Sequence, residues 1–283
     1  MTQTLALRRW QVRSTLAILA LSAASSLLGL FRDGHYTDPS SLLARITAED
    51  AVILLVAVPV LAVGLWGALR GSRGGRVVWL GALAYMTYMW ATIGLNRSFN
   101  DFFLGYVALF ALSLFTLAAG MVRTDPAPFY RTLQGRARRL YAGFLLVTAG
   151  GLAALWVSDV VPAILAGTTP SVIEQFGPQG VVTYVVDLGV VVPSLAVVAV
   201  WLWRDRRWGD LCAGVLLVFA ALLAPGISAI TVVDLQTGVE MTAGMVVGSI
   251  LPPVLGAALA LDFLRRLPGR GPGDAGEGPS LAD

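Results

Sequence analysis

One carboxylate lies within an apolar run where a charge is costly. Residues 181–193 read VVTYVVDLGVVVP, and Asp187 is the single charged side chain among them. A charge at the centre of a membrane-spanning helix costs at least about 2.5–3.5 kcal/mol. Asp187 is therefore expected to face other helices, where a proton, a cation or a basic side chain offsets its charge.

Helical spacing places other polar groups beside Asp187. Thr183 and Tyr184 precede it by four and three residues, so they lie on its side of a helix. A second polar stripe follows residues 77–95 and their continuation. Its members are Tyr85, Tyr88, Thr92, Asn96 and Asn100.

Arg97 and Asp101 lie where this stripe ends. The sequence predicts that Asp187 faces the interior, within reach of this stripe or of Arg97, and Arg97 is the expected ion-pair partner. The candidate ligand-binding residues are Asp187, Tyr184, Thr183, Asp159, Asn96, Arg97, Asn100, Asp101 and Tyr88.

Several functions remain open for these residues. The leading hypothesis is a small-solute or ion transporter with an acidic, outward-facing pocket for a cation or proton at Asp187. The main alternative is a non-catalytic membrane component, such as a sensor, chaperone or complex subunit, whose polar residues only hold helices together. A third is an enzyme that acts on a lipid at the outer leaflet, with Asp159 and Asp187 as acid and base. A last possibility is that the helix boundary assumed above is wrong and that Asp187 is exposed to water at the end of its helix.

The sequence lacks the residue motifs of most known catalytic sites. HExxH, GxSxG and Walker motifs are absent, and Cys212 is the only cysteine. All 20 basic residues are Arg, which excludes a Schiff-base Lys. The one histidine, His35, lies in a polar loop and is expected at the surface. The sequence predicts no cofactor, no metal site and no nucleic-acid partner, and it favours a role other than that of an enzyme.

The polar groups must be positioned by membrane-spanning helices. Hydrophobic residues make up 57% of the 283-residue chain, charged residues make up 13%, and the mean hydropathy is +0.75. Runs of 18 or more apolar residues can cross a bilayer as helices. The sequence therefore predicts an all-α, polytopic membrane bundle of eight transmembrane helices. They fall at about 14–31, 51–69, 77–95, 102–122, 140–162, 180–203, 211–233 and 241–264.

The arginines predict how these helices are oriented. With both termini in the cytoplasm, seventeen Arg lie on the cytoplasmic side and three outside. We therefore expect a prokaryotic inner (plasma) membrane protein that has the lipid bilayer as its partner. The first run continues past its small residues to Phe31, which favours an uncleaved first span over a signal peptide. The oligomeric state is left open.

Two stretches of the chain resemble each other. Residues 56–75 align without gaps to residues 190–209, and the matches include Pro59/Pro193 and Gly75/Gly209. This predicts two parallel four-helix repeats, 10–133 and 134–267, within a single membrane domain of residues 1–267. Shared membrane composition is the alternative explanation. Residues 268–283 are rich in Gly and Pro and are expected to form a disordered cytoplasmic tail.

Two features bear on the transporter hypothesis. Pro225 and Gly226 interrupt the seventh span, and broken helices frame binding sites in many transporters. The cytoplasmic half of the spans is mostly Leu, Val, Ala and Gly, which counts against a continuous polar path.

Overall fold

The computed structural model describes residues 7–177, 180–238 and 243–267. The chain is all-helical, with 84% of residues in helices and no strand within the described residues. Eight helices of this described part are long and apolar enough to cross a membrane, as the sequence predicts.

Four of these helices come before residue 123. They are α1 (Arg9–Phe31), a second helix made of α2 (Ser40–Val52), η1 (Ile53–Ala57) and α3 (Val58–Leu69), then α4 (Arg73–Asn96) and α5 (Phe103–Val122). We call this group the first half.

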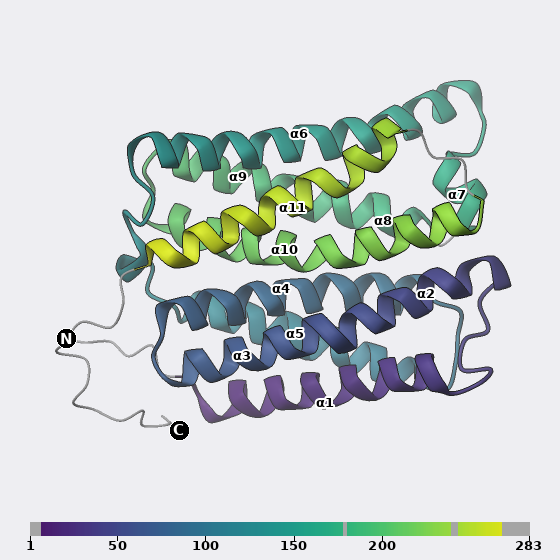
Figure 1. Ribbon diagram of the computed structural model, residues 1–283, viewed down its shortest axis with the longest axis horizontal. Helices are drawn as coiled ribbons and strands as arrows, with labels where there is room; N and C mark the ends of the chain where they lie inside the picture. The colour runs from purple at the N-terminus through teal and green to yellow at the C-terminus, as the bar shows by residue number, and fades with distance from the viewer. Residues whose placement is uncertain (1–6, 178–179, 239–242, 268–283) are drawn as a thin grey trace.

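The other four helices form the second half. They are α6 (Gly135–Ala166), a helix made of α8 (Val181–Val186), η4 (Asp187–Val191) and α9 (Val192–Trp203), then α10 (Arg207–Gln236) and α11 (Ala243–Arg266). Short helices η2 (Ala127–Phe129) and α7 (Ser171–Phe176) lie in the connections. The two halves lie side by side, and α4 packs against α10 where they meet (Figure 1).

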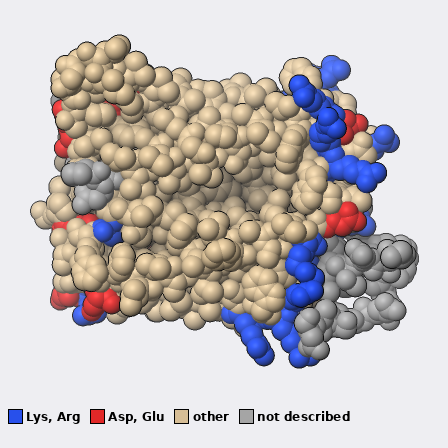
Figure 2. All heavy atoms as spheres, turned by 180° about the vertical axis from the view of Figure 1, so that it is seen from behind, with Lys and Arg blue, Asp and Glu red and all other residues tan. Residues whose placement is uncertain are grey.

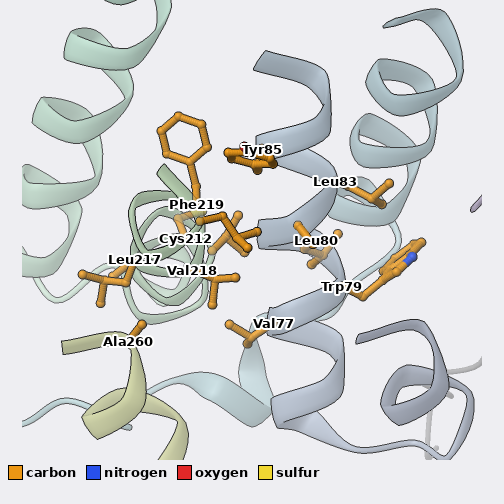
Figure 3. Packing of buried hydrophobic residues seen from close by; sticks show 14 of the residues in the cluster. Val77, Trp79, Leu80, Leu83, Tyr85, Cys212, Leu217, Val218, Phe219 and Ala260 are labelled. Carbon is orange, nitrogen blue, oxygen red and sulfur yellow. The ribbon is translucent and has the colours of Figure 1, made fainter. Parts of the chain in front are cut away.

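The interior is built mainly from α4 and α10. Both helices carry large buried apolar side chains that meet at their crossing (Figure 3). A methyl group placed on Gly81 of α4 would lie 2.5 Å from Cβ of Val218 and 2.9 Å from the Val215 carbonyl oxygen of α10. Such a close approach of backbones requires glycine, so Gly81 sets the distance between the two halves.

The charged residues separate toward the two ends of the bundle. Helices α1, α4, α6 and α10 begin, and α3, α5, α9 and α11 end, at one end, which we call the arginine end. Figure 2 shows Arg side chains gathered there, while the broad surface between the ends is almost free of charge. The opposite end, which we call the acidic end, carries Asp38, Glu49, Asp50, Asp101, Asp159 and Asp234.

The second span of each half contains a five-residue π-helical turn. In the first half this turn is Ile53–Ala57, and in the second half it is Asp187–Val191, which is 134 residues later. Each turn is followed by a proline, Pro59 or Pro193. A proline clashes with the carbonyl four residues earlier, and here that carbonyl lies within the widened turn.

Two expectations about helix ends and breaks are wrong. The second span begins at Ser40 rather than near residue 51, so Glu49 and Asp50 lie within its helix. Helix α10 runs without interruption from Arg207 to Gln236 with Pro225 inside it. The breaks in the regular α-helical pattern are instead the π turns. The tail, residues 268–283, lies outside the described residues.

Candidate functional site

Asp187 is buried between three helices. Its side chain lies at the start of η4, and the residue is 6% exposed. The Tyr88 hydroxyl of α4 donates to Oδ1 at 3.0 Å, and the Trp156 indole nitrogen of α6 donates to Oδ2 at 2.8 Å. The prediction that Asp187 faces the interior and contacts the third span is confirmed.

The predicted ion pair between Arg97 and Asp187 is wrong. Arg97 pairs instead with Glu49 of α2, since the longer α2 brings that carboxylate to the level of Arg97. Asp187 is held at the level of Tyr88, nine residues or roughly 13 Å along the chain from Arg97. None of the ion pairs formed by the described residues includes Asp187, and its two donors are neutral.

Trp156 is a site residue that the sequence reasoning missed. An indole N–H that is removed from water needs an acceptor, and apolar helices offer few. The signal in the sequence was a tryptophan near the outer end of a span, 31 residues before an intramembrane carboxylate.

A second carboxylate site lies next to the first. The Tyr184 hydroxyl donates to Asp159, which also accepts the backbone N–H of Ser171 at 3.0 Å. The Tyr184 and Trp156 rings meet edge to face at a centroid distance of 5.2 Å. Tyr184 therefore bonds to Asp159 rather than to Asp187, and Thr183 is only partly buried beside it.

The remaining predicted ligands lie apart from Asp187, toward the acidic end. Helix α4 stops at Asn96, so the predicted stripe does not continue as one helical face. Asn100 lies beyond the helix and donates to the Tyr106 hydroxyl at 3.2 Å. Asp101 pairs with Arg32 at 2.6 Å. Of the stripe, only Tyr88 reaches Asp187.

The expectation of a surface His35 is wrong. Its residue is 2% exposed, because the loop folds back so that the imidazole Nε2 lies 3.4 Å from the Tyr106 hydroxyl. Burial in this loop lowers the pKa of His35, against the opposing effect of the Asp101 carboxylate. The imidazole is therefore neutral at physiological pH.

Asp50 is another buried carboxylate at the acidic end. The residue is 3% exposed and accepts the Tyr36 hydroxyl at 2.5 Å. A methyl group on Gly29 of α1 would lie 2.2 Å from the Asp50 carboxylate, so only glycine leaves room for this contact. This burial is not visible in the sequence, because the apolar run starts only after Asp50.

Asp234 joins the two halves at the acidic end. It forms an ion pair with Arg45 of α2, and both side chains are largely buried. This carboxylate has a cationic partner, in contrast to Asp187.

The arginine end has an open, polar cavity of about 200 Å³, lined by Arg131, Gln134, Gly135, Arg138 and Asp205. Arg138 pairs with Asp205, and this hydrogen bond lowers the pKa of the Asp205 carboxyl. The positive charge of the arginines that line the cavity is thus partly offset by Asp205.

No group of three or more metal-binding side chains occurs in the part of the chain that the structure describes. The side chains and their contacts are therefore the basis for assigning a function. No family model matches the chain, and neither a curated protein nor a solved structure matches it.

Proposed function

We propose that the protein is a multi-pass protein of a prokaryotic inner membrane and that its arginine end faces the cytoplasm. Eight apolar helices of sufficient length support the insertion. The arginine asymmetry supports the orientation, since cytoplasmic loops carry an excess of Lys and Arg. Both termini then lie inside.

We infer further that the two halves arose by duplication. Helices α3 and α9 have the same bounds when shifted by 134 residues, as have the two π turns. Gly75 packs on the backbone of Gly67, and Gly209 packs on that of Trp201, which are equivalent pairs at this offset. Gly81 approaches Val215, its own equivalent, as expected next to a pseudo-twofold axis.

Within this architecture we propose a small-solute or ion transporter that binds a proton or small cation at Asp187. The carrying observation is a buried carboxylate without a cationic partner, held by Tyr88 of the first half and Trp156 of the second half. A buried carboxylate without a countercharge is expected to take up a proton or a cation. Movement of one half against the other would change the Tyr88 contact and with it the affinity of the site.

The geometry around Asp187 gives less support to the two alternative roles, a structural subunit and a lipid-directed enzyme. A structural subunit would need only the two hydrogen bonds, and would gain nothing from an unpaired carboxylate. A lipid-directed enzyme would need Asp159 and Asp187 at one substrate. Each of these carboxylates instead accepts from its own donors, and the rings of Trp156 and Tyr184 lie next to them.

The change Asp187→Asn tests the proposed site. An asparagine can accept from Trp156 and donate to the Tyr88 oxygen, so both hydrogen bonds are kept and only the charge is lost. We expect the melting temperature of the purified wild type to depend on pH or on added Na⁺ or Li⁺. The variant should lose the response to added Na⁺ or Li⁺ and the part of the pH dependence that Asp187 causes, while melting within a few degrees of the wild type.

Asp234→Asn is the matched control, because Asp234 is a buried carboxylate with a cationic partner. It should lower the free energy of unfolding by about 3–5 kcal/mol, as expected when one member of a buried ion pair is removed, and Arg45→Gln should restore part of this loss. If Asp187→Asn instead lowers stability equally at every pH and cation concentration, Asp187 has only a structural role.

A further inference from the structure

Buried hydroxyl groups line the core of the first half. In apolar helices such groups are expected at a few helix contacts, but here they follow one another along α1 and reappear on the facing helix α5. None of them is more than 1% exposed. They are Thr15, Ser22, Ser25 and Ser26 on α1, and Ser113 and Thr116 on α5.

Contacts with α4 place the hydroxyl groups of α1 along the bundle. The Thr15 hydroxyl accepts the Trp79 indole N–H at 3.1 Å, near the arginine end. The Ser22 hydroxyl lies 4.0 Å from the Met86 sulfur, near the middle. Between Thr15 and Ser22 lie seven residues of helix, or roughly 10 Å.

The hydroxyl groups of α5 fall in this interval. Gly120 of α5 packs on Trp79, which fixes its level near the arginine end. Thr116 and Ser113 lie four and seven residues closer to the acidic end, or roughly 6 and 10 Å. The two α5 hydroxyls therefore lie between the level of Trp79 and that of Met86, in the stretch where α1 has no buried hydroxyl between Thr15 and Ser22.

Several polar atoms of this core have no hydrogen-bond partner in the protein. Leaving a buried polar group unpaired is costly, and in folded proteins such groups are usually satisfied by ordered water. Those in or beside the hydroxyl series include Nε2 of Gln11, Oγ of Ser25, Oγ of Ser26, Nε1 of Trp90, Oγ of Ser113 and Oγ1 of Thr116.

At the acidic end this series of hydroxyls reaches a group that can hold a proton. Ser26 lies beside the Asp50 carboxylate. The other titratable or charged groups facing Asp50 are Tyr36, Glu49, Arg97 and Tyr106. Glu49 is the more exposed carboxylate, at 23% of its side chain, and can pass protons to the outside.

We propose that a file of water molecules follows these hydroxyl groups and carries protons between Gln11 and Asp50. From Gln11 to Ser26 the file spans fifteen residues of α1, or roughly 22 Å. In each step one O–H bond of a water or hydroxyl breaks as another forms on its neighbour. One proton therefore enters at the arginine end for each one that Asp50 releases toward Glu49, and no charge accumulates.

This path is separate from the site at Asp187. Asp187 hydrogen-bonds to Tyr88 and Trp156, neither of which belongs to the hydroxyl series. The path therefore stands whether or not Asp187 binds a cation.

The first experiment asks whether water is present. Hydroxyl radicals made by X-ray radiolysis of bound water oxidise nearby methionines, so the full chain is irradiated in detergent and the oxidation of each methionine is measured by mass spectrometry. Met86 is fully buried beside Ser22 and should nevertheless be oxidised. Protection of Met86 while the more exposed Met121 is oxidised would mean a dry core and would overturn the proposal.

The second experiment measures proton flux into proteoliposomes that contain a pH-sensitive dye, driven by a K⁺ diffusion potential. The wild type and the Asp187→Asn variant should both conduct protons, and adding Asp50→Asn to the latter should abolish the flux. Ser113→Ala and Thr116→Val change the volume of the side chain only slightly. Each removes a hydrogen bond to water, so each should slow the flux by about fivefold, which corresponds to about 1 kcal/mol.

Control variants distinguish the loss of a proton path from a general loss of structure. Ser158→Ala on α6 and Thr231→Val on α10 remove hydroxyl groups that lie in the second half, outside the proposed path, and should leave the flux unchanged. If Asp50→Asn fails to fold, the flux through the hydroxyl variants and the oxidation of Met86 still test whether the path exists. Absence of wild-type flux, or equal flux in Thr116→Val and wild type, would refute the path.

Discussion

At the scale of single residues, three buried carboxylates differ in what offsets their charge. Asp234 has a guanidinium partner, Arg45. Asp50 accepts a tyrosine hydroxyl and lies near the Arg97–Glu49 pair. Asp187 has two neutral donors. The first carboxylate is thus part of a fixed cross-link, whereas uptake of a proton or cation is what we propose for the last.

His35 allows a pH prediction, because it is the only histidine in the chain. Burial lowers its pKa from 6.5, so below about 6.5 the unfolded chain binds a proton that the folded chain resists. The free energy of unfolding should therefore be greatest above this pH and fall as the pH decreases below it.

The measurement is the melting temperature of wild type and His35→Gln in detergent over the acidic range. Glutamine cannot titrate, so the difference between the two proteins should shrink as the pH falls. A difference that is constant over this range would mean that His35 does not resist protonation in the folded state.

At the scale of the elements, glycines set how closely neighbouring helices approach. A methyl group on Gly75 of α4 would lie 2.4 Å from the backbone carbon of Gly67, and one on Gly209 of α10 would lie 3.0 Å from the backbone nitrogen of Leu202. Backbone atoms cannot rotate away as a side chain can. The first contact is tighter because both partners are glycines.

We therefore expect Gly75→Ala to lower the free energy of unfolding by about 1–3 kcal/mol through overpacking. Gly209→Ala should have a smaller effect. Gly150→Ala is the control, since nothing lies within 4 Å of a methyl group there, and it should stabilise α6 by up to about 1 kcal/mol through helix propensity. Thermal unfolding of the three variants gives the order, and a reversed order would contradict the packing described above.

At the scale of the whole molecule, the distribution of charge gives the bundle its two different ends. The arginine end collects the starts of α1, α4, α6 and α10, so the two halves run parallel (Figure 1). On the face shown in Figure 2, the surface between the ends carries almost no charge, as expected of a surface in contact with lipid. An even number of spans per half is what keeps both halves in the same orientation.

Cysteine labelling tests this topology. In a Cys212→Ala background, cysteines at Ser40, Thr169 and Thr237 should react with an impermeant maleimide added outside intact cells. Cysteines at Gln134 and Arg206 should react only after permeabilisation, which also shows that they are accessible. One position that reacts from the wrong side would refute the eight-span arrangement.

The sequence alone determined the helices and their number, since a run of about 20 apolar residues is a local signal. The similarity around Pro59 and Pro193 also marks two positions that follow π turns in the structure. The interior location of Asp187 followed from the cost of a charge in hydrocarbon. None of these inferences depends on which helices become neighbours.

The partners of the polar residues were decided only by the tertiary structure. Arg97 meets Glu49 because α2 extends beyond the apolar run, and Trp156 meets Asp187 because α6 packs against η4. The hydroxyls of α1 form a buried series only because α5 presents Ser113 and Thr116 to the same core. Such contacts depend on the rotation and neighbours of each helix, which a pattern read along one chain does not contain.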